Sequence, residues 1–367
     1  MSLFQRSVSR LLLIHLATVL ASCARTDPAH AQGRVASPEH SGLETGDAVL
    51  IRAAEIVVRA APDVGRVWPG FWTSAKPFVF TRKDPSTMLL VSAVPPPPEY
   101  LAISPTLLSD VLRGHTYLRR GFPVGFGGFH VLYRIGDITV PATGLYSGEM
   151  RHDLRLFYHE AFHGFQLQKF IGNPAQRAVF GGGSALGLDP RYVPEFEEAA
   201  AVERRILSCI LQVGSAQQGE LRLDYLAVRQ QRMRILPAVE KFERWEERHE
   251  GTAELVGIQA AVIAMGENPR RVGELIQQGL AQPNHALQAS STNKWRAYAV
   301  GAALGFMLDQ LGVAWRERVE KGAALDELLM EATSFDPRGA EERAQRARGH
   351  FATGTGPAQC ERTQVHR

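Results

Sequence analysis

The chain has 367 residues, 45% hydrophobic and 22% charged, so it is long enough to bury a sizeable core in one large domain or two modest ones. Its 41 basic and 38 acidic residues give a formal net charge of only +3. Because no basic run with interleaved aromatic residues accompanies this near balance, the sequence argues against nucleic-acid binding.

The first 22 residues have the pattern of a secretory signal peptide. Arg6 and Arg10 precede the apolar run 11–21, which is too short to cross a bilayer as a stable anchor. The sequence LASC, whose last residue is Cys23, resembles the lipobox of bacterial lipoproteins, in which the cysteine is diacylated and becomes the new N-terminus. The resemblance implies stable attachment to a membrane through acyl chains on Cys23.

Residues 23–45 are polar and rich in small side chains, as expected of a tether between such an anchor and a folded body. Because Ala24 rather than an aspartate follows the cysteine, the pattern indicates outer-membrane sorting, with the protein facing the periplasm. An alternative stays open. Ordinary cleavage after the Ala-His-Ala sequence at 29–31 would release a periplasmic or secreted protein instead.

Two cysteines remain once Cys23 is set aside. In an oxidising compartment, Cys209 and Cys360 are expected to form one disulfide that ties the C-terminal tail to a helix. The sequence equally allows Cys209, in the apolar stretch ILSCILQV, to be an unpaired buried residue.

Residues 46–150 are predicted to form an N-terminal α/β part. Four prolines at 95–98 exclude a helix or a central strand, so they must form an extended connector. In chain order, the predicted elements are a helix at 47–61, strands at 77–80 and 87–93, a helix at 101–114, and strands at 129–135 and 137–141 around a Gly136-Asp137 turn.

Residues 151–335 are predicted to form a mainly helical part. The remainder, 336–367, reads as a polar, loosely ordered tail. Strands followed by helices favour an α+β fold, here with a small antiparallel sheet that precedes a helical body. The expected helices cover 152–172, 194–212, 219–248, 250–265, 270–280, 292–311 and 323–332.

The helix at 152–172 carries the sequence His-Glu-Ala-Phe-His at 159–163. Positions four apart share one helical face, so His159 and His163 can reach one metal ion, and Glu160 is offset toward a metal-bound water. A stripe of apolar residues at 3–4 spacing gives the helix a buried face: Leu154, Tyr158, Ala161, Phe162 and Phe165. The alternative is a pair of histidines that share a helix without binding metal.

A catalytic zinc needs a third protein ligand. Gln166 and Lys169 occupy the positions where the metzincin extension has glycine and histidine, so that class is excluded. The ligand must therefore come from another segment. Downstream, the sequence His-Glu-Gly-Thr-Ala-Glu at 249–254 resembles the second motif of gluzincin peptidases, in which a glutamate ligand is followed four residues later by an acidic residue.

That resemblance implies Glu250 as the ligand and Glu254 as the acceptor that fixes the tautomer of a ligand histidine. Small residues at 251–253 are expected to let this helix approach the first closely. The spacing departs from the family, since 87 residues separate His163 from Glu250, where gluzincins have one to two dozen. A glutamate within 195–203, such as Glu198, is therefore a rival third ligand.

The wider layout is similar to a group of uncharacterised bacterial HExxH proteins over most of the mature chain. The matching stretches are WPGF at 68–71, HExFHxxQ at 159–166, EGxAExxG at 250–257 and YxxGAA at 298–303. This resemblance implies a zincin-like fold and a zinc metallopeptidase.

In such an enzyme Zn²⁺ lowers the pKa of its bound water, and Glu160 acts as general base in the hydrolysis of a peptide or protein substrate. Strand 129–135 lies where zincins place the edge strand that pairs with extended substrate. Tyr298 is the candidate oxyanion donor, or else a tyrosine buried in a packing face. The alternative function is a catalytically silent zincin-like lipoprotein that acts as a binding or envelope-assembly factor.

Overall fold

The computed structural model describes residues 43–82, 87–121, 129–136, 138–171, 193–281, 292–352 and 360. The expected signal peptide, the lipidation site Cys23 and nearly all of the expected tether lie outside these residues. Within the described ranges, no helix is both long enough and apolar enough to cross a membrane.

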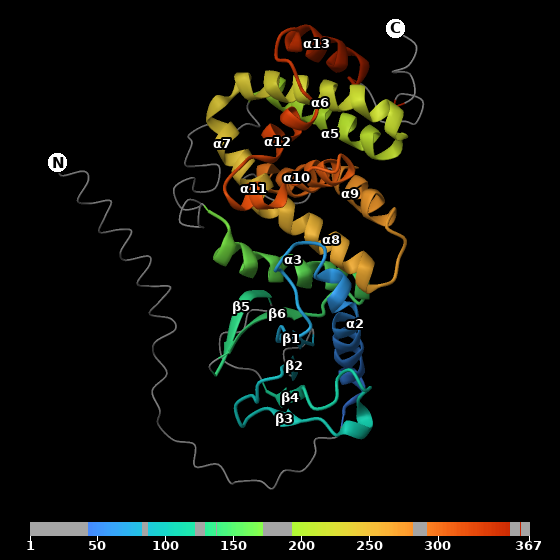
Figure 1. Cartoon of the computed structure of the whole chain (residues 1–367), viewed down its shortest axis with the longest axis vertical. Coiled ribbons are helices and arrows are strands. Elements are labelled where there is room, and N and C mark those ends of the chain that lie inside the picture. The colour runs from blue at the N-terminus through green and yellow to red at the C-terminus, as the bar shows by residue number, and fades with distance from the viewer. Residues whose placement is uncertain are drawn as a thin grey trace, which may run out of the picture. The chain divides into compact units, whose positions relative to one another are not determined.

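The described N-terminal part is built on one six-stranded sheet (Figure 1). Its strands are β1 (Phe78–Thr81), β2 (Thr87–Val91), β3 (Leu101–Ala102), β4 (Thr116–Arg120), β5 (Phe129–Ile135) and β6 (Ile138–Gly144). They are ordered β3-β4-β2-β1-β6-β5, so β5 is an edge strand.

The sheet is mixed, and the prediction of an antiparallel sheet was wrong in one pairing. Strand β1 pairs with β2 in the antiparallel sense and with β6 in the parallel sense. The reason is topological. The β5–β6 hairpin adds beside β1 with its second strand innermost, and that strand runs in the same direction as β1. The fold is therefore α+β, as expected, with a mixed sheet.

The central strands are buried on both faces. Phe78, Phe80 and Leu89 belong to the main core beneath the helices, whereas Val79 and Leu90 belong to a smaller cluster on the opposite face. Alternate side chains point to opposite faces of a strand, so burial on both sides explains why the sequences FVF and MLLV are continuously apolar.

The helix expected at 101–114 is absent. This segment contains the two residues of β3, a 3₁₀ turn at Pro105–Leu107 and further turns before β4. Pro105 lacks the N–H that a helix interior needs, and Gly114 has a φ of 76°. The segment instead bends back so that Leu101 pairs with Leu118 of β4, a strand that the sequence reading had missed.

The other described helices mostly follow the predicted ranges. They are α2 (Ala48–Val64), α3 (Met150–Lys169), α5 (Pro194–Gln212), α6 (Ser215–Ile235), α7 (Pro237–Glu246), α8 (Thr252–Ala264), α9 (Arg271–Ala281), α10 (Thr292–Gln310), α11 (Arg316–Glu320), α12 (Leu325–Ala332) and α13 (Ala340–His350). In Figure 1, α3 lies between the sheet and α8.

The single helix expected at 219–248 is divided. Leu236 has φ −139° and ψ 73°, outside the helical region, because the ring of Pro237 disfavours that region for the residue before it. After α7 the chain forms a short π-helix, η5 (Glu247–Gly251), which leads directly into α8.

The C-terminal segment has more structure than the expected loose tail. Helix α13 packs against α6, and Arg343 of α13 pairs with Glu220 and Asp224 of α6. Cys360 is joined to Cys209 of α5 by a disulfide, which confirms the predicted pairing.

Candidate metal centre

Helix α3 presents its two motif histidines from a buried position. The predicted apolar stripe is confirmed: Leu154, Tyr158, Ala161 and Phe162 are almost wholly inaccessible to solvent. Phe162 packs against Trp68 of the WPGF stretch, with ring centroids 4.9 Å apart. This packing fixes the rotation of α3 and therefore the direction in which its histidines point.

Three potential ligand atoms, from His159, His163 and Glu250, lie close together. The Nε2 atoms of His159 and His163 lie 3.1 Å apart, and Oε2 of Glu250 lies 3.4 Å from the first and 3.1 Å from the second. In a tetrahedral site with bonds of about 2.0–2.1 Å, neighbouring ligand atoms lie about 3.3 Å apart. The observed spacing fits one zinc-sized ion. Among the described residues, these three form the one His/Cys/Asp/Glu cluster suited to a metal.

Glu250 reaches the histidines from the π-helix η5. A π-helix inserts an extra residue into a helical turn and is frequent at functional sites. Two glycines allow η5 to approach α10. A Cβ atom on Gly251 would lie 2.4 Å from Cα of Gly301, and one on Gly301 would lie 2.5 Å from the carbonyl oxygen of Glu247. Gly251 was expected to face α3, but it faces α10.

A buried ionic network joins η5 to α6 and α12. Arg229 of α6 donates two hydrogen bonds to Glu247, of 2.9 and 2.7 Å, and another of 2.9 Å to Asp326 of α12. Burial raises the pKa of Glu247 to about 7 against the opposing effect of Arg229. Since a bidentate guanidinium–carboxylate pair restricts orientation as well as position, Arg229 limits the movement of the helix that carries Glu250.

The rival glutamates do not reach the centre. Glu198 is 71% exposed and pairs with Arg348, and Glu197 pairs with Arg296. Glu203 is buried, but it is held by Arg232. Glu195 is exposed at the start of α5. The structure therefore selects Glu250 from the two alternatives that the sequence had left open.

His159 is held between two carboxylates. Its Nδ1 lies 3.5 Å from Oε2 of Glu254, whose other oxygen lies 3.4 Å from Arg155. Burial lowers the pKa of His159, but the carboxylates of Glu250 and Glu254 outweigh burial and raise that pKa to about 9. Glu254 thus lies beside the histidine for which it was predicted, but at 3.5 Å Nδ1 of His159 makes no hydrogen bond to a described residue. Gly257 allows α8 this close, because a Cβ there would lie 2.7 Å from the carbonyl oxygen of Arg155.

The neighbours of His163 differ from those of His159, and they were not predicted from the sequence. Its Nδ1 lies 2.7 Å from Oε1 of Gln166, whose amide nitrogen reaches the backbone oxygen of His249 and the hydroxyl of Thr252. The ring of His249 stacks on that of His163 with centroids 4.8 Å apart. The available signal was the position of Gln166, three residues after His163 on the same helical face.

Glu160 is half-buried and makes no hydrogen bond or ion pair within the part of the chain that the structure describes. It is close enough to raise the pKa values of both His159 and Tyr298 electrostatically. It is therefore a carboxylate beside the candidate centre that pairs with no side chain among the described residues.

Tyr298 lies against the centre from α10. Its ring stacks on His159 with centroids 5.3 Å apart and an interplanar angle of 6°. Burial, followed by the Glu250 carboxylate to which the hydroxyl is hydrogen-bonded, raises the pKa of Tyr298 well above its ordinary value. The hydroxyl stays protonated across the physiological range and is available as a donor.

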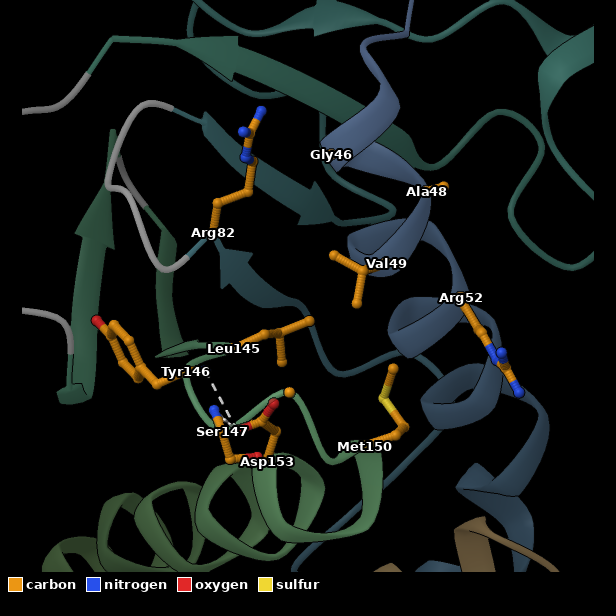
Figure 2. Close-up of a pocket in the computed structure, with 11 residues that line it drawn as sticks. Gly46, Ala48, Val49, Arg52, Arg82, Leu145, Tyr146, Ser147, Met150 and Asp153 are labelled. Carbon is orange, nitrogen blue, oxygen red and sulfur yellow. Dashed lines mark hydrogen bonds between the residues drawn. The ribbon is translucent and has the colours of Figure 1, made fainter.

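A separate hollow of about 1020 Å³ lies beside the first turn of α3 (Figure 2). Arg82 on its wall pairs with Glu44, and Asp153 accepts the backbone N–H groups of Tyr146 and Ser147. Asp153 precedes His159 by six residues, about 9 Å along the helix. The hollow is therefore distinct from the candidate metal centre, and Asp153 has a structural role at the start of α3.

No protein-family model matches this sequence, and comparisons with curated proteins and with solved structures find no significant similarity. Function lies in sites rather than in folds, so the residues of the candidate centre are the guide to what this chain does.

Proposed function

We propose that this chain is a zinc-dependent peptidase of gluzincin type that acts in the bacterial cell envelope. The observation that carries the proposal is the buried cluster of His159, His163 and Glu250, with the carboxylate of Glu160 beside it, which pairs with none of the described residues. Two imidazoles and one carboxylate are the protein ligands of many catalytic zinc sites, in which a fourth position stays open for water.

The donor set favours zinc among the common metals. Imidazole nitrogen suits zinc and other late transition metals, whereas magnesium and calcium prefer sites made of oxygen atoms. Gln166 lies behind His163 at hydrogen-bond distance from its Nδ1, and Glu254 lies 3.5 Å from Nδ1 of His159. Such partners orient metal-binding imidazoles.

When held by His159, His163 and Glu250, zinc would supply Lewis-acid chemistry and would lower the pKa of a water molecule. Glu160 takes a proton from the attacking water and passes it to the leaving amine. The Tyr298 hydroxyl donates a hydrogen bond to the oxyanion that forms on the substrate carbonyl. For this role it must exchange its present hydrogen bond with Glu250 for one with the substrate.

The zincin-like fold is part of the same proposal. Edge strand β5 contacts α3, so an extended peptide added to its free edge would run beside the motif helix. Acyl chains on Cys23 would attach the protein to the membrane. The Cys209–Cys360 disulfide supports an oxidising compartment such as the periplasm.

Metal analysis and one conservative substitution test the proposal. We expect about one zinc per chain in the purified protein, and its loss in His159→Ala and His163→Ala. Glu160→Gln should retain the zinc but lose cleavage of unfolded protein substrates by about 100-fold or more. A metal-free wild type would contradict the zinc site. A zinc-loaded wild type without cleavage would instead favour the silent binding or assembly factor.

A further inference from the structure

We propose that Gln166 is a positioning residue that selects the tautomer of His163 and ties that histidine to the helix carrying Glu250. The inference rests on the proposed metal site, but it does not require peptidase activity. Gln166 is only 2% exposed, so water does not compete for its amide group.

The orientation of the Gln166 amide follows from its two other partners. Its Nε2 lies 2.7 Å from the backbone oxygen of His249, which can only accept a hydrogen bond. It also lies 2.9 Å from the Thr252 hydroxyl, whose proton is donated to the backbone oxygen of Arg248 at 2.6 Å. Both partners are therefore acceptors, and the NH₂ end of Gln166 must face them.

This orientation determines the protonation of His163. With its NH₂ end directed at η5 and α8, Gln166 directs Oε1 at Nδ1 of His163, 2.7 Å away. An amide oxygen can only accept, so Nδ1 must carry a proton. In the neutral ring the lone pair is then on Nε2, the atom that faces His159 and Glu250. The histidine is held in the form that binds a metal.

The same side chain joins the elements that supply the ligands. Gln166 belongs to α3 with His163, and its two acceptors belong to the turns on either side of Glu250. Losing this amide would release the ring of His163 and remove a direct link between α3 and η5. We therefore expect substitution of Gln166 to weaken metal binding more than substitution of another buried glutamine would.

The first test measures zinc affinity. Gln166→Met keeps the length of the side chain but removes its three hydrogen bonds, and loss of such partners weakens metal binding by about 10- to 100-fold. Gln218→Met is a matched control, because Gln218 is also buried and donates to two backbone oxygens, those of Ile210 and Val213. Zinc affinity in Gln166→Met within twofold of wild type would overturn the proposal.

The second test needs no folded variant of Gln166. In metal-free wild-type protein labelled with ¹⁵N-histidine, the His163 signal, identified by its loss in His163→Gln, should show a protonated Nδ1. A neutral ring protonated on Nε2 would overturn the proposal. Neither readout involves cleavage, so a protein that passes both tests but cleaves nothing would contradict the proposed function alone.

Discussion

The fold changes the protonation of His159. Burial lowers its pKa, but Glu250 and Glu254 outweigh burial and raise it to about 9. The unfolded value is about 6.5. The protonated ring therefore stabilises the metal-free protein fully below about pH 6.5, and this stabilisation is lost as the pH rises through about 9. We expect this contribution to the free energy of unfolding of the metal-free protein to decrease between about pH 6.5 and pH 9.

Urea denaturation in the presence of a chelator, at several pH values from 6 to 10, measures this contribution. Other groups titrate in the same range, since burial lowers the pKa of Lys76 to about 8. The informative quantity is therefore the difference between wild type and His159→Gln, which should shrink as the pH rises. A difference that stays constant with pH would show that His159 is not held protonated by the two carboxylates.

Two neighbouring histidines of one motif thus have different supports. His159 faces a carboxylate that also contacts Arg155, whereas His163 faces a neutral amide that is held by two acceptors. The first support adds negative charge behind the ring, and the second fixes hydrogen-bond direction without charge. Both supports lie beside Nδ1, and Nε2 of each ring faces Glu250.

At the scale of elements, the centre depends on the close approach of α8 to α3. A Cβ atom on Gly257 would lie 2.7 Å from the backbone oxygen of Arg155 and 3.2 Å from Cβ of His159. Backbone atoms cannot move aside as the end of a side chain can. We expect Gly257→Ala to force the helices apart, to destabilise the protein by about 1–3 kcal/mol and to weaken zinc binding.

Gly273→Ala in α9 is the matched control for Gly257→Ala. The added methyl group would lie 3.6 Å from Phe306, an ordinary contact, and alanine is favoured over glycine within a helix by up to about 1 kcal/mol. Thermal unfolding and zinc titration of both variants provide the comparison. If Gly257→Ala behaved like Gly273→Ala in both measurements, close helix packing would not be what places the ligands.

The elements that sequence could predict are those with their own periodic signal. Helix α3 has a continuous apolar stripe, and the acidic pair Glu250 and Glu254 is spaced by one helical turn, so both were visible in the sequence. The parallel pairing of β1 with β6 was not visible, because it joins residues as far apart in the sequence as Val79 and Ala142 and depends on where the β5–β6 hairpin adds to the sheet.

The choice of Glu250 over Glu198 shows the same limit. Both are glutamates on predicted helices. In the structure Glu198 is exposed and paired with Arg348, whereas Glu250 is buried beside two histidines. This difference depends on the arrangement of α5, α10 and η5. The π-helix that carries Glu250 has no sequence signal of its own. It depends on the contact between Gly251 and Gly301, which are 50 residues apart.

At the scale of the whole molecule, one covalent link crosses most of the helical part. The disulfide joins Cys209 to Cys360 across a sequence separation of 151 residues, and α13 lies on α6 within that loop. In the chain-entropy account, closing a loop of this length stabilises the fold by about 5 kcal/mol, because it restricts the unfolded chain. Glu250 and Tyr298 of the candidate metal centre lie between the two cysteines in the sequence. Both motif histidines precede Cys209 and are therefore outside the loop that the disulfide closes.

This arrangement predicts separate responses of stability and metal binding to reduction. Cys360→Ser, or treatment with a thiol reductant, should lower the melting temperature by several degrees, because it removes the cross-link. Zinc content should be unchanged at temperatures where the fold persists, because the ionic network of Arg229 and the glycine contact at Gly251 still hold η5. Melting curves and metal analysis with and without reductant measure both. Zinc loss at temperatures below melting would instead show that the cross-link itself holds the ligands together.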